Sequence, residues 1–261
     1  MNANANTNEL MAKLENGFNE LVVGDNYANY LKTMAKFHRY SFNNIMLIVM
    51  QYPEASQVAG YKKWQELGRN VRKGETSIKI LAPCPHKKTV TNDDGEETEI
   101  RWTTYRPVSV FDIAQTEGKE LPEICRKLTG EVSDYEALME GLKKVAQVAV
   151  TFENITCGAN GYYDKNKGIV LNNGMEQTQT VKTFVHEIAH SVLHKDTDKS
   201  REQREVEAES VAYVVCQALG IDSSDYTFGY LAGWASGDSK LLKQSLNDIQ
   251  KCADMIITAL S

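Results

Sequence analysis

The stretch His186-Glu187-Ile188-Ala189-His190 constrains the fold of this chain more than any other part of its sequence. On an α-helix, residues four apart lie on one face, about 6 Å apart along the axis, so two imidazoles can converge on one metal ion. Apolar residues flank the motif at helical spacing, which predicts a helix that packs against a core. These residues are Val181, Phe184, Val185, Ile188, Ala189, Val192 and Leu193.

The chemistry of the motif points to zinc. Neutral imidazoles are common ligands of Zn²⁺, and His186 and His190 are the two expected here. Glu187 follows the first ligand and lies beside the open coordination position, where it can accept a proton from the attacking water. The alternative is a chance match on an ordinary buried helix. The pattern therefore predicts a Zn²⁺ cofactor and a general base, Glu187.

A third protein ligand has several candidates. His194 continues the four-residue spacing, but a straight helix carries it about 12 Å from His186. It is therefore expected at a helix end or on the surface. Asp196 stands six residues after His190, where metzincins have their third ligand. Those sequences break the helix with glycine three residues after the second histidine, and here Leu193 occupies that position.

A second helix, expected from Arg201 to Leu219, supplies the remaining candidates: Glu202, Glu205, Glu207 and Glu209. Its segment 205–209 resembles the Glu-x-x-Ala-Asp/Glu signature of gluzincin-type metallopeptidases. The resemblance implies that Glu205 binds the metal and that Glu209 supports a ligand histidine through a hydrogen bond. Alternatively, the four acids form a solvated face, which is expected for Glu202 and possible for Glu207.

Length and composition indicate a cytoplasmic protein of two modest domains. The chain has 261 residues and no apolar run near the ~20 residues needed to span a bilayer, so no membrane partner is expected. Residues 1–8 are polar and predict a disordered tip without targeting function. Five dispersed cysteines form no C-x-x-C pair and are expected to be reduced: Cys84, Cys125, Cys157, Cys216 and Cys252.

The net charge of −6 hides a basic segment between Lys32 and Lys88. This segment contains eleven Lys and Arg residues and three acidic residues, a charge balance of +8, and six aromatic residues are interleaved with them. Cations that follow phosphates, together with rings on which bases stack, are typical of surfaces that bind single-stranded nucleic acid. The alternative is a solvated basic face whose aromatic residues belong to the core.

The order of short motifs in this region favours the nucleic-acid interpretation. The motifs are Tyr40-Ser41-Phe42-Asn43-Asn44 before a helical run to Gln51, Gly60-Tyr61-x-x-Trp64, Gly68-Arg69, Arg72-Lys73-Gly74-Glu75, a strand-like 77–81 and a strand-like 110–116. Read in this order, they resemble the N-terminal domain of the ArdC antirestriction family, which conjugative plasmids and related mobile elements carry.

The resemblance implies a domain that binds single-stranded DNA (ssDNA), followed by a zincin-like metallopeptidase domain. The residues expected to contact DNA are Tyr40, Asn43, Asn44, Trp64, Arg69, Arg72, Lys73 and Lys79. The family also has a similar tyrosine and tryptophan before a long C-terminal helix. Tyr230 could therefore donate a hydrogen bond to the transition state, although a packed aromatic residue is the alternative.

The expected fold class is α+β with two domains. Residues 1–125 would form the ssDNA-binding α+β domain, and residues 126–261 a mainly helical zincin-like domain with a small sheet. Helices are expected at 8–37, 41–51, 134–148 and 239–260. Residues 76–113 are expected to be rich in β-structure, with a hairpin tip at 92–95, and further strands are expected at 151–152 and 169–172. A linker is expected at 121–130. Residues 168–172 are a candidate edge for pairing with an extended substrate, or else an interior strand.

Two functions follow from these patterns. In the first, the chain is a zinc metallopeptidase recruited to ssDNA, where it hydrolyses a peptide bond in a DNA-associated protein. In the second, it is a DNA-binding antirestriction protein in which zinc is structural and peptidase activity is absent. An intact Glu187 favours the first, because a structural metal site does not need a base.

Overall fold

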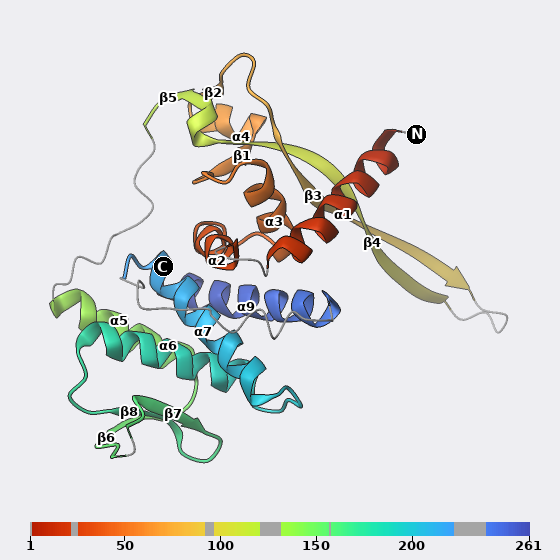
Figure 1. Cartoon of the computed structure of the whole chain (residues 1–261). Helices are drawn as coiled ribbons and strands as arrows, with labels where there is room; N and C mark the ends of the chain where they lie inside the picture. Colours follow the sequence, from red (N-terminus) through yellow and green to blue (C-terminus); the bar gives the residue numbers. More distant parts are fainter. Residues whose placement is uncertain (1, 22–25, 92–96, 121–131, 157, 222–238) are drawn as a thin grey trace. The chain divides into compact units, whose positions relative to one another are not determined.

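A computed structural model describes residues 2–21, 26–91, 97–120, 132–156, 158–221 and 239–261 (Figure 1). The chain forms two compact units. Unit 1 contains residues 1–17 and 43–121, and unit 2 contains residues 18–42 and 122–261. The N-terminal segment 18–42 therefore groups with the C-terminal half, whereas the sequence suggests a linear division between residues 125 and 126. That linear boundary stays a proposal, and the expected linker at 121–130 lies outside the described residues.

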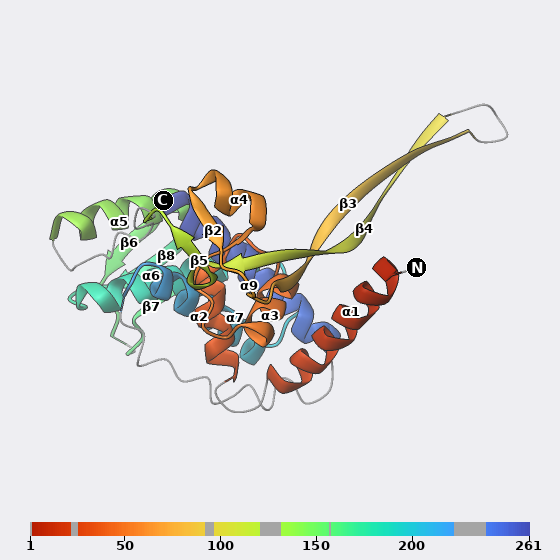
Figure 2. The same ribbon diagram turned by 90° about the horizontal axis from the view of Figure 1, so that it is seen from above.

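Unit 1 is built on a three-stranded antiparallel sheet with strand order β1-β4-β3. Long strands β3 and β4 pair from Ile78↔Val110 to Thr91↔Glu97, and their far ends extend as a two-stranded ribbon (Figure 2). Strands β2 and β5 form a separate two-stranded sheet. The elements are α1 (Asn2–Leu21, shared with unit 2), α3 (Phe42–Gln51), β1 (Val58–Gly60), α4 (Tyr61–Glu66), β2 (Arg69–Val71), β3 (Ile78–Thr91), β4 (Glu97–Asp112), η1 (Ile113–Gln115) and β5 (Thr116–Gly118).

The core of unit 1 lies where α3 and α4 meet the sheet. Ile45, Leu47 and Ile48 of α3 are buried, as is Trp64 of α4. Asn44 fixes α3 to β3, because its side chain donates to the Leu81 carbonyl at 2.9 Å and accepts from the Leu81 amide at 2.8 Å. This pair of hydrogen bonds satisfies a buried amide group in the core.

Several local expectations for the N-terminal half need correction. The single helix expected at 8–37 is two helices, α1 and α2 (Asn26–Lys36), and α1 begins at Asn2, where a disordered tip was expected. The strand expected at 110–116 is interrupted. Asp112 ends β4 and accepts a hydrogen bond from the Ala114 amide, which caps η1, and β5 begins only at Thr116. A capping aspartate explains this break.

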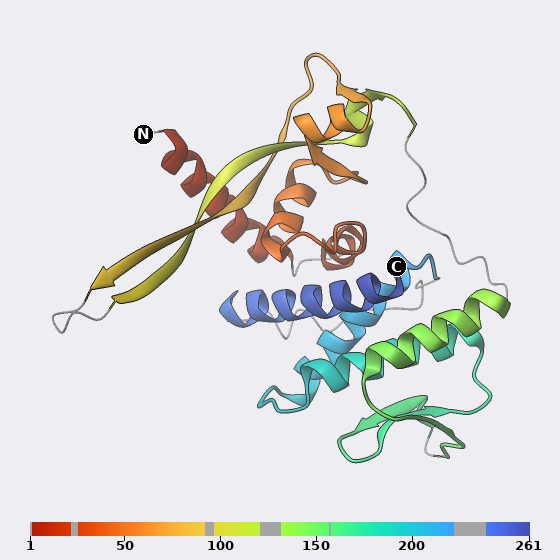
Figure 3. The same cartoon turned by 180° about the vertical axis from the view of Figure 1, so that it is seen from behind.

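Unit 2 is a helical domain with one small sheet. Its further elements are α5 (Val132–Ala146), β6 (Val150–Glu153), β7 (Gly161–Asp164), β8 (Gly168–Asn172), α6 (Gln177–Leu193), α7 (Arg201–Ala218) and α9 (Ser239–Leu260). The sheet packs on α6 through β7 and β8, while α5 and α7 pack on α6 as well (Figures 1 and 3). Helix α6 is thus surrounded, which explains the apolar residues around its motif. The bounds expected for α7 and α9 are confirmed to within one residue.

The sheet of unit 2 has the order β6-β8-β7, with β6 parallel and β7 antiparallel to β8. Strand β8 is therefore central, and the interpretation of 168–172 as a sheet edge is wrong. Within the described residues the edges are β6 and β7. The sequence interpretation missed β7, because Gly161 indicated a loop. A Cβ on Gly161 would lie 2.8 Å from Thr183 Cγ2, so glycine permits the close approach of β7 to α6.

The helices and strands together confirm the α+β class. No helix in the described ranges is both long and apolar enough to cross a membrane. Cys84, Cys216 and Cys252 are not in disulfide bonds, while Cys125 and Cys157 lie outside the described residues.

Candidate metal centre

Helix α6 brings His186 and His190 together on the side of the helix that its buried residues leave open. The core face carries Phe184, Val185 and Ile188, which are fully buried. The two histidines lie one turn apart, and their Nε2 atoms are 3.0 Å from each other. Both rings therefore point to one location, as the four-residue spacing predicts.

Glu205 of α7 completes this group. Its Oε2 lies 3.4 Å from His186 Nε2 and 3.6 Å from His190 Nε2. Zn–N and Zn–O bonds of about 2.0–2.1 Å in a tetrahedron give ligand–ligand distances of about 3.3 Å. The observed distances fit such a tetrahedron to within a few tenths of an ångström. Two imidazoles and one carboxylate can thus hold a divalent cation and leave one coordination position open.

The electrostatics of the group also suit a cation. Burial alone would lower the pKa of His186, but hydrogen bonds to Glu205 and Glu209 raise that pKa to about 9. Hydrogen bonds with His186 and His190 hold the pKa of the Glu205 carboxyl far below its ordinary value, so this carboxyl is ionised. A cation that binds here replaces the proton on His186 and keeps the attraction of both acids.

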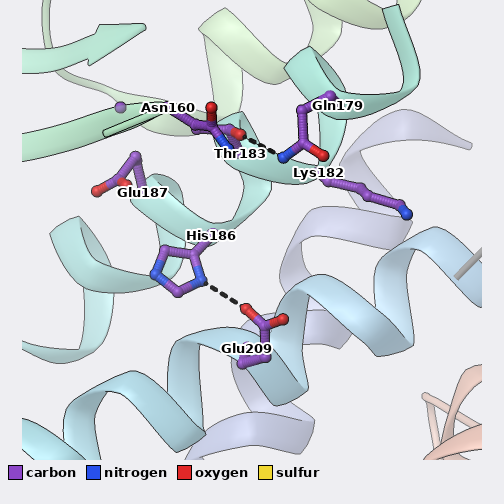
Figure 4. A pocket seen from close by; sticks show the side chains of 8 residues that line it. Asn160, Gln179, Lys182, Thr183, His186, Glu187 and Glu209 are labelled. Atoms are coloured by element: carbon purple, nitrogen blue, oxygen red, sulfur yellow. Dashed lines mark hydrogen bonds and ion pairs between the residues drawn. The ribbon is translucent and has the colours of Figure 1, made fainter. Parts of the chain in front are cut away.

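His186 and His190 each have a separate hydrogen-bond partner at Nδ1. Glu209 Oε2 lies 3.1 Å from His186 Nδ1, and Figure 4 draws this contact as a dashed line. The ring can therefore donate to the carboxylate and present Nε2 to a metal. Glu209 is the residue for which the sequence predicts this role, and the geometry suits it.

His190 has a different support. Its Nδ1 lies 2.9 Å from Nδ1 of His194, and Nε2 of His194 lies 2.9 Å from Glu207 Oε2. The expected helix-end position of His194 is confirmed, since it follows the last residue of α6. The surface and solvated-face interpretations of His194 and Glu207 are wrong, because both side chains are buried.

Glu207 belongs to a network of buried and half-buried polar groups. Both of its carboxylate oxygens lie 2.9 Å from Lys199 Nζ, and it also accepts a hydrogen bond from Ser245. Lys199 in turn pairs with Asp248 at 3.0 Å. Burial would raise the pKa of Glu207, but hydrogen bonds from His194, Ser245 and Lys199 outweigh burial and lower the pKa. The carboxylate is therefore charged and fully partnered, as a buried charge must be.

Glu187 lies next to the ligand group without joining it. Its residue is 6% exposed, burial raises the pKa of its carboxyl, and the backbone N–H of Tyr163 in β7 donates to it. Two cavities, of about 350 and 410 Å³, share His186, Glu187 and Gly161 in their walls. The carboxylate therefore faces the space in which a substrate would meet the metal group.

Two other predicted residues stand apart from this centre. Asp196 is exposed and forms an ion pair with Lys165 at 2.8 Å, outside the group formed by His186, His190 and Glu205. Tyr230 lies outside the described residues, so its predicted role stays untested.

The residues expected to contact DNA differ in burial and in the unit to which they belong. Trp64 is 2% exposed and donates from Nε1 to the Phe111 carbonyl at 2.8 Å, and Asn44 is engaged with Leu81. Neither side chain is open to a base. Tyr40 belongs to unit 2, where it packs edge-to-face on Phe37.

The four cations of that set have mixed surroundings. Arg69 donates to the Thr116 side chain and the Lys119 carbonyl, and so holds β2 to the end of β5. Arg72 pairs with Glu75 at 2.7 Å. Lys73 is exposed, as is Lys79, whose Nζ donates to Ser109. Asn43 is half-buried in α3.

The sequence interpretation missed an exposed aromatic group on the β3–β4 ribbon. Trp102 is 45% exposed and stacks on His86 with ring centroids 5.3 Å apart. The register puts Arg106 and Lys88 on the same face of the ribbon. Tyr105, half-exposed, lies on the opposite face. Alternating aromatic and cationic residues in a long hairpin were the available signal.

Comparison with known families separates two regions of the chain. Residues 2–111 match the N-terminal domain of the anti-restriction factor ArdC. Residues 144–216 match the IrrE N-terminal-like domain of the M78 peptidases. An uncharacterized protein of Bacillus anthracis is 29% identical over 246 residues, a match that covers 77% of this chain. The match covers 41% of that relative, so this chain spans less than half of its length.

Two solved structures share the fold. The metal-free ArdC antirestriction protein of plasmid R388 has a TM-score of 0.54 at 21% identity, with 84% of each chain covered. The Mn(II)-bound structure of the same protein has a TM-score of 0.57 at 18% identity, and covers 95% of this chain and 98% of that one. The arrangement of two unlike domains therefore occurs in a protein of known structure.

Proposed function

Since this chain combines the N-terminal domain of ArdC antirestriction factors with an IrrE-like domain of the M78 peptidases, we propose that it is a metal-dependent peptidase that binds ssDNA. Its biological role would be that of an antirestriction factor of a mobile element. Its substrate would be a peptide bond in a DNA-associated protein. The observation that supports the peptidase activity best is the convergence of His186, His190 and Glu205 beside the buried base Glu187.

His186, His190 and Glu205 would hold the cation through two nitrogens and one oxygen. Zn²⁺ is the cation we propose, because this donor set and a tetrahedral spacing suit it. When bound, it would supply Lewis acidity to the attacking water and the scissile carbonyl. Glu187 would accept a proton from that water and deliver it to the leaving amine, a role that a raised pKa favours.

The substrate backbone would lie along β7. This strand is an edge of its sheet within the described residues, and it borders both cavities through Gly161. An extended peptide that pairs with a sheet edge gains main-chain hydrogen bonds and presents its carbonyl in a fixed register. The amide of Tyr163 already donates to Glu187, so the strand also orients the base.

The ssDNA would bind to the β3–β4 ribbon. The stacked pair of His86 and Trp102 offers a ring to an unpaired base, and Lys88 and Arg106 lie on the same face for the phosphates. This surface replaces Trp64 and Asn44 as the proposed contact with bases.

The alternative, a DNA-binding protein with structural zinc and no peptidase activity, has less support. A structural zinc site is closed by four protein ligands, whereas the described residues here supply three. A buried glutamate beside such a site would raise the cost of folding without a compensating function. A cytoplasmic location stays a prediction.

The test combines metal analysis with a cleavage assay. The purified chain should contain about one divalent cation, and elemental analysis distinguishes zinc from manganese. His190→Ala should lose the metal, whereas Lys195→Gln, an exposed control nearby, should keep it. Cleavage of an unfolded protein substrate should require the metal and should be measured with and without ssDNA. A chain that retains its metal in the His190 variant would exclude the proposed centre.

A further inference from the structure

One of the two cavities at the metal centre carries two arginines that form no ion pair with any of the described acids. This cavity, of about 410 Å³, is lined by Arg201 and Arg204 of α7, together with Glu205 and His190. Residues three apart on a helix share a face, so both guanidinium groups project toward the same space. Among the described residues, neither group has an ion pair or a side-chain hydrogen bond, and Arg204 Nε is buried without a partner.

The neighbouring acids have other contacts: Glu202, whose charge interacts with both arginines without forming an ion pair, accepts a hydrogen bond from Ser200. Glu205 lies against the two ligand histidines, and Glu207 is held by Lys199 and His194. A buried nitrogen that can donate but finds no acceptor costs free energy, and in native proteins such a group calls for an explanation. An acceptor that arrives with a ligand would satisfy this nitrogen.

We propose that Arg204, assisted by Arg201, binds a carboxylate of the peptide substrate next to the scissile bond. The planar guanidinium matches a carboxylate in a two-bond geometry that a lysine cannot offer. The cavity wall also contains Tyr162 and Tyr163, so a peptide paired with β7 passes directly beside these arginines. This inference rests on the proposed peptidase function and names its substrate class: a peptide with an acidic group close to the cleavage site.

The carboxylate could be an Asp or Glu side chain or the C-terminus of the peptide, and three probes separate these sources. The first is a short fluorescent peptide with one internal Glu and an amidated C-terminus. The second has Gln in place of Glu, and the third has Gln and a free C-terminus. Binding is measured by fluorescence anisotropy with the full-length, metal-loaded Glu187→Gln protein, which cannot consume the probe.

The Glu peptide should bind about tenfold more tightly than the Gln peptide, as expected for a charge-assisted hydrogen bond. Arg204→Gln should remove this difference. Arg204→Lys should keep only part of it, because lysine keeps the charge but cannot form two parallel hydrogen bonds with the carboxylate. The control Lys195→Gln removes an equal charge outside the cavity and should keep the full difference. If only the third probe gains affinity, the site binds the C-terminal carboxylate.

Equal binding of all three probes, or a difference that survives Arg204→Gln, would overturn the inference. So would a loss of affinity for a 5′-phosphorylated oligothymidine in Arg204→Gln but not in Lys195→Gln, which would assign the arginines to nucleic acid. Cleavage by the wild-type chain is scored separately. Cleavage without preference for Glu removes only the arginine pocket, whereas Glu-selective binding without any cleavage removes only the peptidase activity.

Discussion

The metal centre and the β3–β4 ribbon use polar side chains in opposite ways. At the centre, both histidines have hydrogen-bond partners at Nδ1: Glu209 contacts His186, while His194, itself paired with Glu207, contacts His190. On the ribbon, Trp102 and Tyr105 are about half-exposed, and the aromatic stack is open to solvent. The first arrangement orients the side chains of the centre, and the second exposes side chains on a surface.

This difference suits the two activities proposed for the chain. Hydrolysis requires a base and a metal in one geometry, and helices that lock each other through hydrogen bonds supply it. Binding of a flexible single strand requires rings and charges that accept many sequences, and an exposed ribbon supplies these at little cost in stability. Substitutions at the centre should therefore alter chemistry, metal affinity and folding, whereas substitutions on the ribbon should alter binding alone.

The largest effect is expected at Glu187. Glu187→Gln keeps the size and the hydrogen-bond acceptor of the side chain but cannot accept the proton. Cleavage should fall by about 10²- to 10⁴-fold, the usual contribution of a general base. Metal content and the thermal midpoint should stay unchanged, which elemental analysis and calorimetry check. Residual cleavage close to wild type would mean that another group deprotonates the water.

A large effect on folding is expected at Glu207. Its charge is fully buried between Lys199, His194 and Ser245, so Glu207→Ala should reduce the free energy of unfolding by about 3–5 kcal/mol, the cost of leaving a buried partner charge uncompensated. Because the folded pKa of Glu207 is lowered, its contribution is complete at neutral pH and is lost as the pH falls through the folded value.

Urea denaturation of the metal-free protein measures this change, and Glu202→Ala serves as the control. Glu202 is an exposed glutamate in the first turn of the same helix, so its removal should cost far less. Equal losses in the two variants would contradict the buried network.

A smaller effect, confined to metal affinity, is expected at Glu209. This side chain is 41% exposed, so Glu209→Gln should leave folding nearly intact. Without its carboxylate, His186 loses orientation and basicity, and metal affinity should fall about 10- to 100-fold. His194→Asn should also lower metal affinity through His190, but it should reduce stability as well, because it removes a partner of the buried Glu207 carboxylate. Competition with a chromophoric chelator measures both affinities, and an unchanged value for Glu209→Gln would show that the ring needs no such support.

Local spacing explains which parts of the centre could be predicted from the sequence. Four-residue separation on an apolar helix is enough to put His186 beside His190, and the acids of the next helix include Glu205. The burial of His194 and Glu207 could not be predicted, because it depends on how α9 packs against α7. Strand β7 was missed for a related reason: Gly161 is required by contact with Thr183, which is distant in sequence.

The ribbon shows that composition alone does not identify which aromatic residues are exposed. Trp64 and Trp102 both stand among cations in the sequence, yet Trp64 is 2% exposed and Trp102 is 45% exposed. The family motifs pointed to Trp64, but its indole donates a hydrogen bond to the Phe111 carbonyl and lies in the core. Exposure is set by tertiary packing, so the sequence predicted the type of surface but not the residues that form it.

The smallest effect is expected on the ribbon, and it tests the comparison most directly. Trp102→Ala should weaken ssDNA binding by about 1–3 kcal/mol, the usual value of one base stacked on an aromatic ring. The salt dependence of binding should not change, because no phosphate contact is lost. Arg106→Ala should weaken binding and also flatten that salt dependence. Both variants should unfold at the wild-type temperature, since their side chains are exposed.

Fluorescence anisotropy with a labelled oligothymidine at several salt concentrations measures these changes, and Phe152→Ala is the matched control. Phe152 is 43% exposed on β6 in the other unit, so its loss removes an exposed ring without touching the ribbon. Equal ssDNA affinity for the wild type and Trp102→Ala would exclude the stacked pair as a contact with bases. A lower unfolding temperature of Trp102→Ala would show that the ribbon, like the metal centre, depends on its side chains for folding, and the contrast between the two regions would not hold.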